Sequence, residues 1–345
     1  MSLSKKILVF GYFGYVTNQL DGQTVKTREI YDLIKTHKDY EVRYADTQEF
    51  RKGFKSIIHF INDLCSCDTL VWMPAHNNIK IFAPIIYILS VTCRFDIVTV
   101  TIGGWLNEFL KNLPLHRRIY MSFKGILVEN RLMQKALATT FNRNTIEVIP
   151  NFRKKSPKPK PRKSDGKLKL VFMARINRKK GLAEIAYLCE YIKTNHYTDR
   201  ISVDFYGQIN AEDEDYFRTE IICKYDFTNY GGALQPDKIN ATLVNYDLML
   251  LPTRYFTEGF PGTVLDAYQA GLPVIATRWK HATEFIDDNR SGIIINFDNP
   301  KEELIAAVIR LYENPSLLAE MKQMAYLESL KYTPEEGWKV LSKYL

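Results

Sequence analysis

Polar residues and glycines are dense between residues 246 and 276, in an order typical of a ligand site. An apolar run that ends near Pro252 predicts a buried strand, and Glu258 follows it in a loop. Pro261 offers the fixed φ of a helix start, and Gly271 marks the end of that helix. A helix N-terminus at the carboxyl end of a parallel strand suits a phosphate group.

Two carboxylates, Glu258 and Asp266, lie eight residues apart around this helix start. Each carboxylate can accept hydrogen bonds from hydroxyl groups, so both can bind the same polyol ligand. Gly262 at the helix start allows a ligand to approach the backbone closely. Taken singly, each acid is more often a plain loop acid or a solvated helix residue, so the prediction depends on their combination.

A short basic loop supplies the complementary charge. Arg175 ends a predicted strand, and Lys180 precedes the next predicted helix. Arginine presents a planar fork to a diphosphate, and lysine presents a mobile point charge. Basic loops are common, but this one is predicted at the mouth of the same sheet as Glu258.

Apolar runs and helical patterns alternate in two series along the chain. The first series has strand-like runs at 6–12, 40–46, 69–74, 96–103, 125–129 and 145–149. The second has them at 168–174, 202–206, 228–230, 247–251, 274–276 and 292–295. Runs rich in Val and Ile without polar alternation are typical of parallel sheets covered on both faces. We therefore predict an α/β protein with two doubly wound, Rossmann-like domains that face a central cleft.

The expected domain boundaries follow a basic, proline-rich segment. Residues 1–152 form the expected first domain, and residues 168–332 form the expected second domain. Residues 153–167 alternate Pro with Lys, which favours a stiff, solvated polyproline II connector. A last helix at about 333–345 is a candidate to pack back on the first domain.

Composition and charge narrow the class of protein. The 345 residues are 46% hydrophobic and 25% charged, which excludes a disordered or collagen-like chain. The net charge of +8 is uneven, with +13 in residues 1–163 and −5 in the rest. This asymmetry predicts an anionic partner, such as an acidic membrane surface or a phosphorylated substrate. Nucleic acid is not expected, because no recognition helix or aromatic RNA-binding signature accompanies the charge.

The motifs resemble those of the retaining, metal-independent glycosyltransferases of the glycogen-synthase-like family 4, which have the GT-B fold. The resemblance covers nearly all of the second domain. It rests on Arg175-x4-Lys180-Gly181, Tyr230-Gly-Gly232 and Glu258-Gly-Phe-x4-Leu-Asp266-Ala-x3-Gly271-Leu-Pro-Val-Ile-Ala. In the first domain it is looser and depends on the initial strand, the loop 21–23 and residues 148–151.

The resemblance implies that a sugar moves with retention from a UDP- or GDP-sugar to a glycan or lipid-linked acceptor. Cell-surface polysaccharide synthesis is the implied process, with no metal or other cofactor. Glu258, Arg175 and Lys180 are the implied catalytic residues: the two cations bind the diphosphate, and Glu258 accepts sugar hydroxyls. Asp266 is the implied ribose ligand.

Backbone groups complete the implied donor site. Those near Phe260, Gly262 and Thr263 meet sugar and phosphate, and the stretch after Gly232 cradles the base. The loop at Gly22 faces the donor phosphates across the cleft.

Two departures from the family pattern bear on the site. Asp266 stands where the family usually has Glu, which is one methylene longer. Many members carry a His after the fourth strand of the first domain, where this chain has Gly103, Gly104 and Trp105. We predict that this loop lies on the acceptor side. Trp105 is there either a sugar platform or a core aromatic, and His76 either lines the cleft or is a loop residue without a role.

Other patterns favour less specific interpretations. Asp213-x-Asp215 resembles a manganese-binding pair, but acids in the first turn of a helix are typical of a solvated face, and no metal site is predicted. The run 81–89 is more typical of a buried helix than of a membrane contact, and 81–93 is too short to span a bilayer. The five Cys have no zinc-binding spacing, which indicates free thiols in a reducing compartment. We therefore expect a cytoplasmic protein, which can also bind peripherally to the inner face of the membrane.

Two alternatives of function remain at this point. One is a non-catalytic nucleotide-sugar-binding or membrane-adaptor protein on the same fold, which the missing His and the shorter Asp266 favour. The other is an enzyme of similar architecture, either a nucleotide-sugar epimerase or a phosphorylase. A phosphorylase needs a pyridoxal-binding Lys, for which the sequence offers no candidate.

Overall fold

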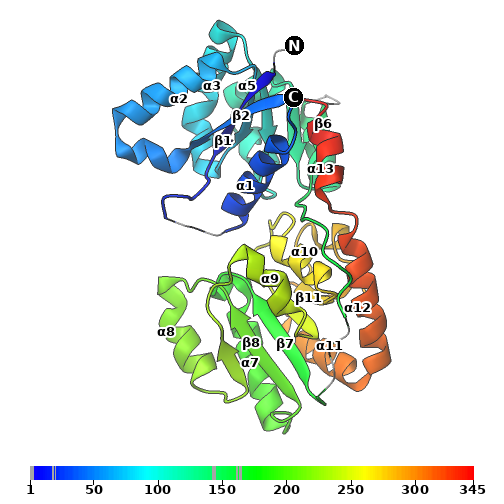
Figure 1. The fold of residues 1–345 in the computed structure, drawn as a ribbon. Coiled ribbons are helices and arrows are strands. Elements are labelled where there is room, and N and C mark those ends of the chain that lie inside the picture. Colours follow the sequence, from blue (N-terminus) through cyan, green and yellow to red (C-terminus); the bar gives the residue numbers. More distant parts are fainter. Residues whose placement is uncertain (1–3, 18, 20, 142–144, 161, 163–164) are drawn as a thin grey trace. The chain divides into compact units, whose positions relative to one another are not determined.

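The computed structural model describes residues 4–17, 19, 21–141, 145–160, 162 and 165–345. The chain divides into two compact units (Figure 1). The first is Met1–Asn151 with Pro334–Leu345, and the second is Phe152–Thr333. Each unit contains a six-stranded parallel sheet, so the predicted α/β architecture with two Rossmann-like halves is confirmed.

The sheet of the first unit has the order β2-β1-β3-β4-β5-β6. Its strands are β1 Lys5–Gly11, β2 Tyr40–Asp46, β3 Thr69–Met73, β4 Asp96–Val100, β5 Gly125–Val128 and β6 Ile146–Val148. Every residue of β3 and β5 is buried. Burial on both faces explains why these strands read as continuous apolar runs.

The helices of the first unit are α1 Gly22–Lys35, α2 Phe54–Ser66, α3 Ile79–Cys93, α4 Leu106–Lys111, α5 Pro114–Met121, α6 Arg131–Phe141 and α13 Pro334–Leu341. Short 3₁₀ turns occupy Thr47–Lys52 and His76–Asn78. Residues of α2 to α6 share one core with alternate strand residues such as Phe10 and Trp72. The last helix, α13, belongs to this unit, and its Trp338 stacks on His37 of the α1–β2 connection, with ring centroids 3.5 Å apart.

The sheet of the second unit has the order β12-β11-β10-β7-β8-β9. Its strands are β7 Leu168–Met173, β8 Ile201–Tyr206, β9 Thr228–Tyr230, β10 Leu248–Leu251, β11 Val274–Thr277 and β12 Gly292–Ile295. Leu170 and Phe172 point into one core, while Val171 and Met173 point into another. This alternation of a period-2 strand puts one apolar layer on each face of the sheet.

The helices of the second unit are α7 Leu182–Thr194, α8 Glu214–Phe217, α9 Pro236–Leu243, α10 Gly262–Gln269, α11 Lys301–Glu313 and α12 Pro315–Ser329. Single turns lie at Arg178–Lys180, Ala211–Asp213 and Ala282–Glu284, and a π-helical turn lies at Arg218–Ile222. Residues 211–222 therefore form three short helical pieces and not one continuous helix. Core residues of α7 and α11 cover one face of the sheet, and those of α10 cover the other.

The proline-rich segment is solvated only in part. The Nη2 of Arg162 donates to Asp247 at 2.8 Å, and Gln269 donates to the carbonyl oxygen of Lys154 at 2.7 Å. The side chains of Arg153 and Arg162 are only 17% and 12% exposed. The solvated interpretation is wrong for these two residues, because acids of the second unit neutralise them there.

The prediction that the run 81–89 is a buried helix is also wrong in part. Helix α3 buries Ile79, Ala83 and Ile86, but Ile81 and Ile88 on its other side are 65% and 61% exposed. A helix on one face of a sheet has one apolar stripe in the core, whatever the composition of its outer side. Within the described residues, no helix is both long and apolar enough to cross a membrane.

The cysteines do not all carry thiols. Cys65 at the end of α2 and Cys93 at the end of α3 form a disulfide. Cys67 and Cys189 are buried thiols, and Cys223 is an exposed one. The prediction of thiols is therefore wrong for the first pair, whose partners lie 28 residues apart and meet only because α2 packs on α3.

Candidate active site

Two predicted site residues, Lys180 and Glu258, meet at the carboxyl end of the second sheet. The Nζ of Lys180 donates to Oε1 of Glu258, and the hydroxyl of Thr253 lies 3.4 Å from the same oxygen. The ring of Tyr255 lies 4.8 Å from the Lys180 Nζ. The ion pair forms because the central strands β7 and β10 are neighbours, so that the loops after them emerge side by side.

Gly181 is what permits this close approach. Its φ is +97°, and a Cβ there would collide with the carbonyl oxygen of Pro252, directly after β10. Only glycine satisfies both conditions. Arg175, the other predicted cation, lies in the same βα loop, two residues after β7, and is exposed.

Asp266, the predicted ribose ligand, is bound by an arginine that the sequence did not single out. Arg153 donates from Nε to Oδ1 of Asp266 at 2.7 Å and from Nη2 to Oδ2 at 3.4 Å. The Asp266 side chain is 9% exposed. In the sequence Arg153 is one of seven basic residues of a charge run, and only its place at the head of that run, directly after Asn151 and Phe152, distinguishes it.

The start of α10 completes this group. Pro261 is the N-cap residue, with φ −61°, and no side chain caps the helix. A Cβ on Gly262 would lie 2.8 Å from Nη2 of Arg153, so the guanidinium sits against the helix start. The uncapped helix N-terminus, which favours an anion, therefore lies beside the Arg153–Asp266 ion pair.

The remaining predicted donor residues differ in exposure. Phe260 is buried and stacks on Phe285, with ring centroids 4.0 Å apart, so only its backbone is available to a ligand. Thr263, in the first turn of α10, is partly exposed. Gly232 follows edge strand β9 with φ +79°, and its carbonyl oxygen accepts from the Gly207 N–H at 2.9 Å.

The acceptor-side candidates form an aromatic cluster in the first unit. The ring of His76 lies edge-on to Trp105 and to Phe109, with centroids 4.8 Å and 4.7 Å away. Trp105 is partly buried, and its Nε1 donates to the Ile102 carbonyl oxygen at 2.8 Å. Gly104 of the same loop is buried. The cluster thus presents an aromatic surface with one polar ring, that of His76.

A buried ion pair supports this loop. Glu129 accepts from the Gly103 N–H at 3.0 Å and from Lys26 at 3.0 Å. Lys26 also donates to the Ile149 carbonyl oxygen. The residue Gly103 has φ +82°, where a side chain is strained. No sequence pattern indicates the pair of Lys26 and Glu129, because the two residues are 103 positions apart and meet only in the fold.

The predicted Gly22 starts helix α1. Its N-cap, Asp21, accepts from the Thr24 N–H at 2.9 Å, and Thr24 accepts in return from the Asp21 N–H. A Cβ at Gly22 would meet nothing within 4 Å, so the position is open to a ligand.

The Asp-x-Asp pair is not a solvated face throughout. Asp213 is buried, and its carboxylate lies 3.2 Å from Nε of Arg178, so the solvated interpretation is wrong for this residue. Within the described part of the chain, no group of three or more His, Cys, Asp or Glu is placed to hold a metal ion.

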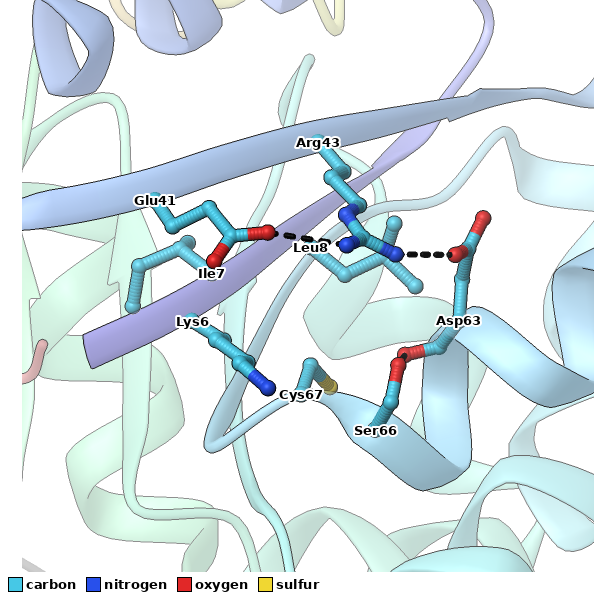
Figure 2. Close-up of a pocket in the computed structure, with 8 residues that line it drawn as sticks. All are labelled: Lys6, Ile7, Leu8, Glu41, Arg43, Asp63, Ser66 and Cys67. Atoms are coloured by element: carbon cyan, nitrogen blue, oxygen red, sulfur yellow. Dashed lines mark hydrogen bonds and ion pairs between the residues drawn. The ribbon is translucent and has the colours of Figure 1, made fainter. Parts of the chain in front are cut away.

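A small hollow lies in the first unit, and none of these candidates lines it. It is lined by β1, β2 and the end of α2, and its volume of ≈ 10 Å³ is room for about one water. Figure 2 shows Arg43 bridging Glu41 and Asp63 across it, which raises the pKa of the arginine. We assign it no function.

Comparison with known proteins decides the family. The model of the family described as "Glycosyl transferases group 1" matches residues 153–328, which is half of the chain. The protein belongs to the group 1 glycosyltransferases. The matched segment begins at Arg153 and contains every donor-side candidate except Gly22.

Relatives and solved structures agree with this assignment. The chain is 21% identical over 244 residues to alpha-galactosylglucosyldiacylglycerol synthase of Streptococcus pneumoniae, covering 66% of this chain and 62% of that one. It is 26% identical over 150 residues to the amylovoran biosynthesis glycosyltransferase AmsK of Erwinia amylovora, covering 42% and 36%. The matches thus span less than two thirds of these relatives' length. HepE of Anabaena in complex with UDP-glucose has the same fold, with a TM-score of 0.72 at 14% identity and 98% coverage of both chains.

Proposed function

We propose that the protein is a retaining, metal-independent glycosyltransferase that moves a sugar from a UDP- or GDP-sugar to a glycan or lipid-linked acceptor. Cell-surface polysaccharide synthesis is the proposed setting. The observation that carries the proposal is the Lys180–Glu258 ion pair beside the uncapped start of α10. A cation for phosphate and an acid for hydroxyls are the two groups that a nucleotide sugar needs.

Donor binding exchanges this ion pair for two contacts with the substrate. The diphosphate binds the ammonium of Lys180 and the guanidinium of Arg175. The sugar hydroxyls donate hydrogen bonds to the carboxylate of Glu258. Positive charge at this place stabilises the nucleotide diphosphate as it leaves, which is the largest catalytic effect we expect.

In this proposal Arg153 and Asp266 bind different parts of the nucleotide. The nearer oxygen of Asp266, Oδ1, holds the guanidinium at 2.7 Å, whereas Oδ2 at 3.4 Å keeps capacity to accept a ribose hydroxyl. Nη2 of Arg153, against Gly262, is then directed to a phosphate oxygen at the start of α10. The guanidinium so compensates for the methylene that Asp266 lacks relative to Glu. Backbone groups of Phe260 and Thr263 complete the phosphate and sugar contacts.

Transfer with retention needs no nucleophile from the chain. The bond from the anomeric carbon to the diphosphate breaks, and the acceptor hydroxyl bonds to that carbon from the same face. An oxygen of the leaving diphosphate takes the acceptor's proton. Glu258 orients the sugar, and the aromatic surface of Trp105 and His76 receives the acceptor.

The names of the relatives support the acceptor class. One is named as the synthase of a galactosylglucosyldiacylglycerol and one as a glycosyltransferase of amylovoran biosynthesis. The net charge of +13 in residues 1–163 supports a peripheral position on the inner, cytoplasmic face of an anionic membrane.

A panel of nucleotide sugars in a thermal-shift assay, followed by an acceptor screen on the best donor, tests the proposal. We expect one donor to stabilise the protein and its nucleotide diphosphate to be released only when acceptor is present. The anomeric configuration of the product reports retention, and full activity in excess chelator reports metal independence. Stabilisation without turnover on any acceptor would favour a non-catalytic binding protein, and isomerised donor without acceptor would favour an epimerase.

A further inference from the structure

Helix α2 exposes an apolar stripe to solvent. Phe54, Ile57, Ile58 and Ile61 follow one another at helical spacing and are 74%, 38%, 45% and 38% exposed. Residues three and four apart lie on one face of a helix. The opposite side of α2 provides the contacts with the core, so this stripe is not part of it.

Helix α3 exposes a second stripe. Ile81, Ile85, Ile88 and Val91 are 65%, 47%, 61% and 63% exposed, again at spacings of three and four. Lys80 is the only charged residue of the helix. A surface helix of a soluble protein normally carries polar residues on its outer side, so α3 departs from that pattern.

The two stripes adjoin and form one surface, which we call the apolar face. Helices α2 and α3 pack side by side on the sheet of the first unit (Figure 1), and the Cys65–Cys93 disulfide joins their ends. Of the 19 large hydrophobic side chains exposed in the described residues, nine lie on these two helices. Single exposed apolar residues are ordinary, but such a concentration marks a site of interaction.

The charges around the apolar face are mainly positive. Helices α2, α3 and α5 carry Lys55, Lys80, Arg117 and Arg118, all exposed. The acidic residue of α2, Asp63, forms an ion pair with Arg43 at 3.1 Å (Figure 2), so its charge is neutralised. A two-fold contact with a second copy would bring these cations against the same cations of the partner, which is unfavourable.

We propose that the apolar face is the docking surface for an anionic lipid bilayer. The isoleucines of α2 and α3 enter the boundary between headgroups and acyl chains, and the lysines and arginines contact lipid phosphates. The packing of α2 against α3 holds the two helices in register for this contact. This surface goes beyond the proposed transferase function, because attraction by charge alone would be screened by salt, whereas burial of apolar side chains is not.

Cosedimentation with vesicles separates the contribution of charge to membrane binding from that of the apolar side chains. Phosphatidylcholine vesicles with and without phosphatidylglycerol are compared at low salt and at about 0.5 M salt, where charge is largely screened. We expect part of the wild-type binding to survive high salt. The double variant Ile85→Ser/Ile88→Ser should lower that part about tenfold or more, which is about 1.4 kcal/mol. A matched double variant on exposed residues of the second unit, Tyr187→Ser/Leu327→Ser, should bind as the wild type does.

A second readout reports depth in the membrane. Tryptophan placed by Ile88→Trp should be quenched by lipids with brominated acyl chains, and tryptophan placed by Leu327→Trp should not. Binding that salt abolishes entirely, or equal quenching at the two positions, would overturn the proposal. So would vesicle-independent dimers, seen by light scattering, that Ile85→Ser/Ile88→Ser dissociates. Donor binding and transfer to a water-soluble acceptor, measured on the same variants, should be unchanged, so failure of docking is distinct from failure of the transferase proposal.

Discussion

Arg153 and Asp266 form a two-point ion pair, with Nε 2.7 Å from Oδ1 and Nη2 3.4 Å from Oδ2. The pair fixes the beginning of the proline-rich segment against α10. Because both side chains are largely buried, the guanidinium has few alternative positions. The fork geometry of arginine suits this double contact, and lysine does not reproduce it.

Arg153→Lys therefore keeps the charge but removes the fork. We expect this variant to bind the preferred nucleotide diphosphate about tenfold more weakly, since a charged hydrogen bond contributes about 1.5–3 kcal/mol. Asp266→Asn should weaken binding of nucleotide and nucleotide sugar by about tenfold to a hundredfold. Titration calorimetry with UDP and GDP on these variants is the measurement.

The double variant Arg153→Lys/Asp266→Asn completes the cycle. If the two residues act together, its loss should be smaller than the sum of the single losses. Lys154→Gln, in the next and exposed position, is the matched control and should bind normally. Wild-type affinity in both single variants would remove Arg153 and Asp266 from the donor site.

Glu258→Gln should separate sugar from nucleotide. The carboxylate is assigned to the sugar, so its loss should abolish most transfer. Binding of the bare nucleotide diphosphate should be retained or tighter, because Lys180 loses its competing ion pair. Calorimetry and single-turnover transfer measure the two effects, and full turnover in Glu258→Gln would refute the assigned site.

Asp247→Asn should destabilise the second unit in a pH-dependent way. Burial opposes ionisation of Asp247, but Arg162 and Lys322 outweigh it and hold the pKa of the carboxyl below its ordinary value. A lowered folded-state pKa gives stability that is present above the unfolded pKa, about 3.9, and lost as pH falls through the folded pKa. We expect a loss of about 3 kcal/mol at pH 7, because Arg162 and Lys322 lose a largely buried carboxylate partner, although Arg162 keeps Asp165 as an acidic neighbour.

Urea unfolding between pH 3 and pH 7 measures this dependence. The difference between wild type and variant should shrink below about pH 4. Asp237→Asn, which removes an exposed acid of α9, is the control and should unfold at the wild-type urea concentration at every pH. A difference that persists unchanged to pH 3 would contradict the ion-pair explanation.

Thiol counting tests the cysteine assignment. Without reductant, the folded protein should react at one thiol, Cys223, because Cys67 and Cys189 are buried. Burial also raises the pKa of Cys67 to about 12, so little thiolate is present at neutral pH. Unfolding without reductant should expose three thiols, and reductant should raise the number to five. Five thiols before reduction, in protein purified without reductant, would show that Cys65 and Cys93 are not joined.

Some features of the protein follow from the sequence because their causes are local. Runs such as β3 and β10 are apolar on both faces, and this composition by itself predicts parallel strands covered by helices. The start of α10 at Pro261–Gly262 and its end before Gly271 follow from the conformational preferences of proline and glycine. The spacing of Lys180 and Glu258 relative to the strands was enough to predict one site, and the structure places them in contact.

The tertiary structure alone decided the rest, because those features depend on which surfaces pack together. Arg153 and Asp266 are 113 residues apart, and Lys26 and Glu129 are 103 apart, so no local pattern links them. The composition of α3 predicts burial, yet a helix on a sheet has an outer side, and only packing determines which isoleucines face solvent. A sequence specifies the preference of each residue for apolar or charged surroundings, but the surroundings exist only once distant segments meet.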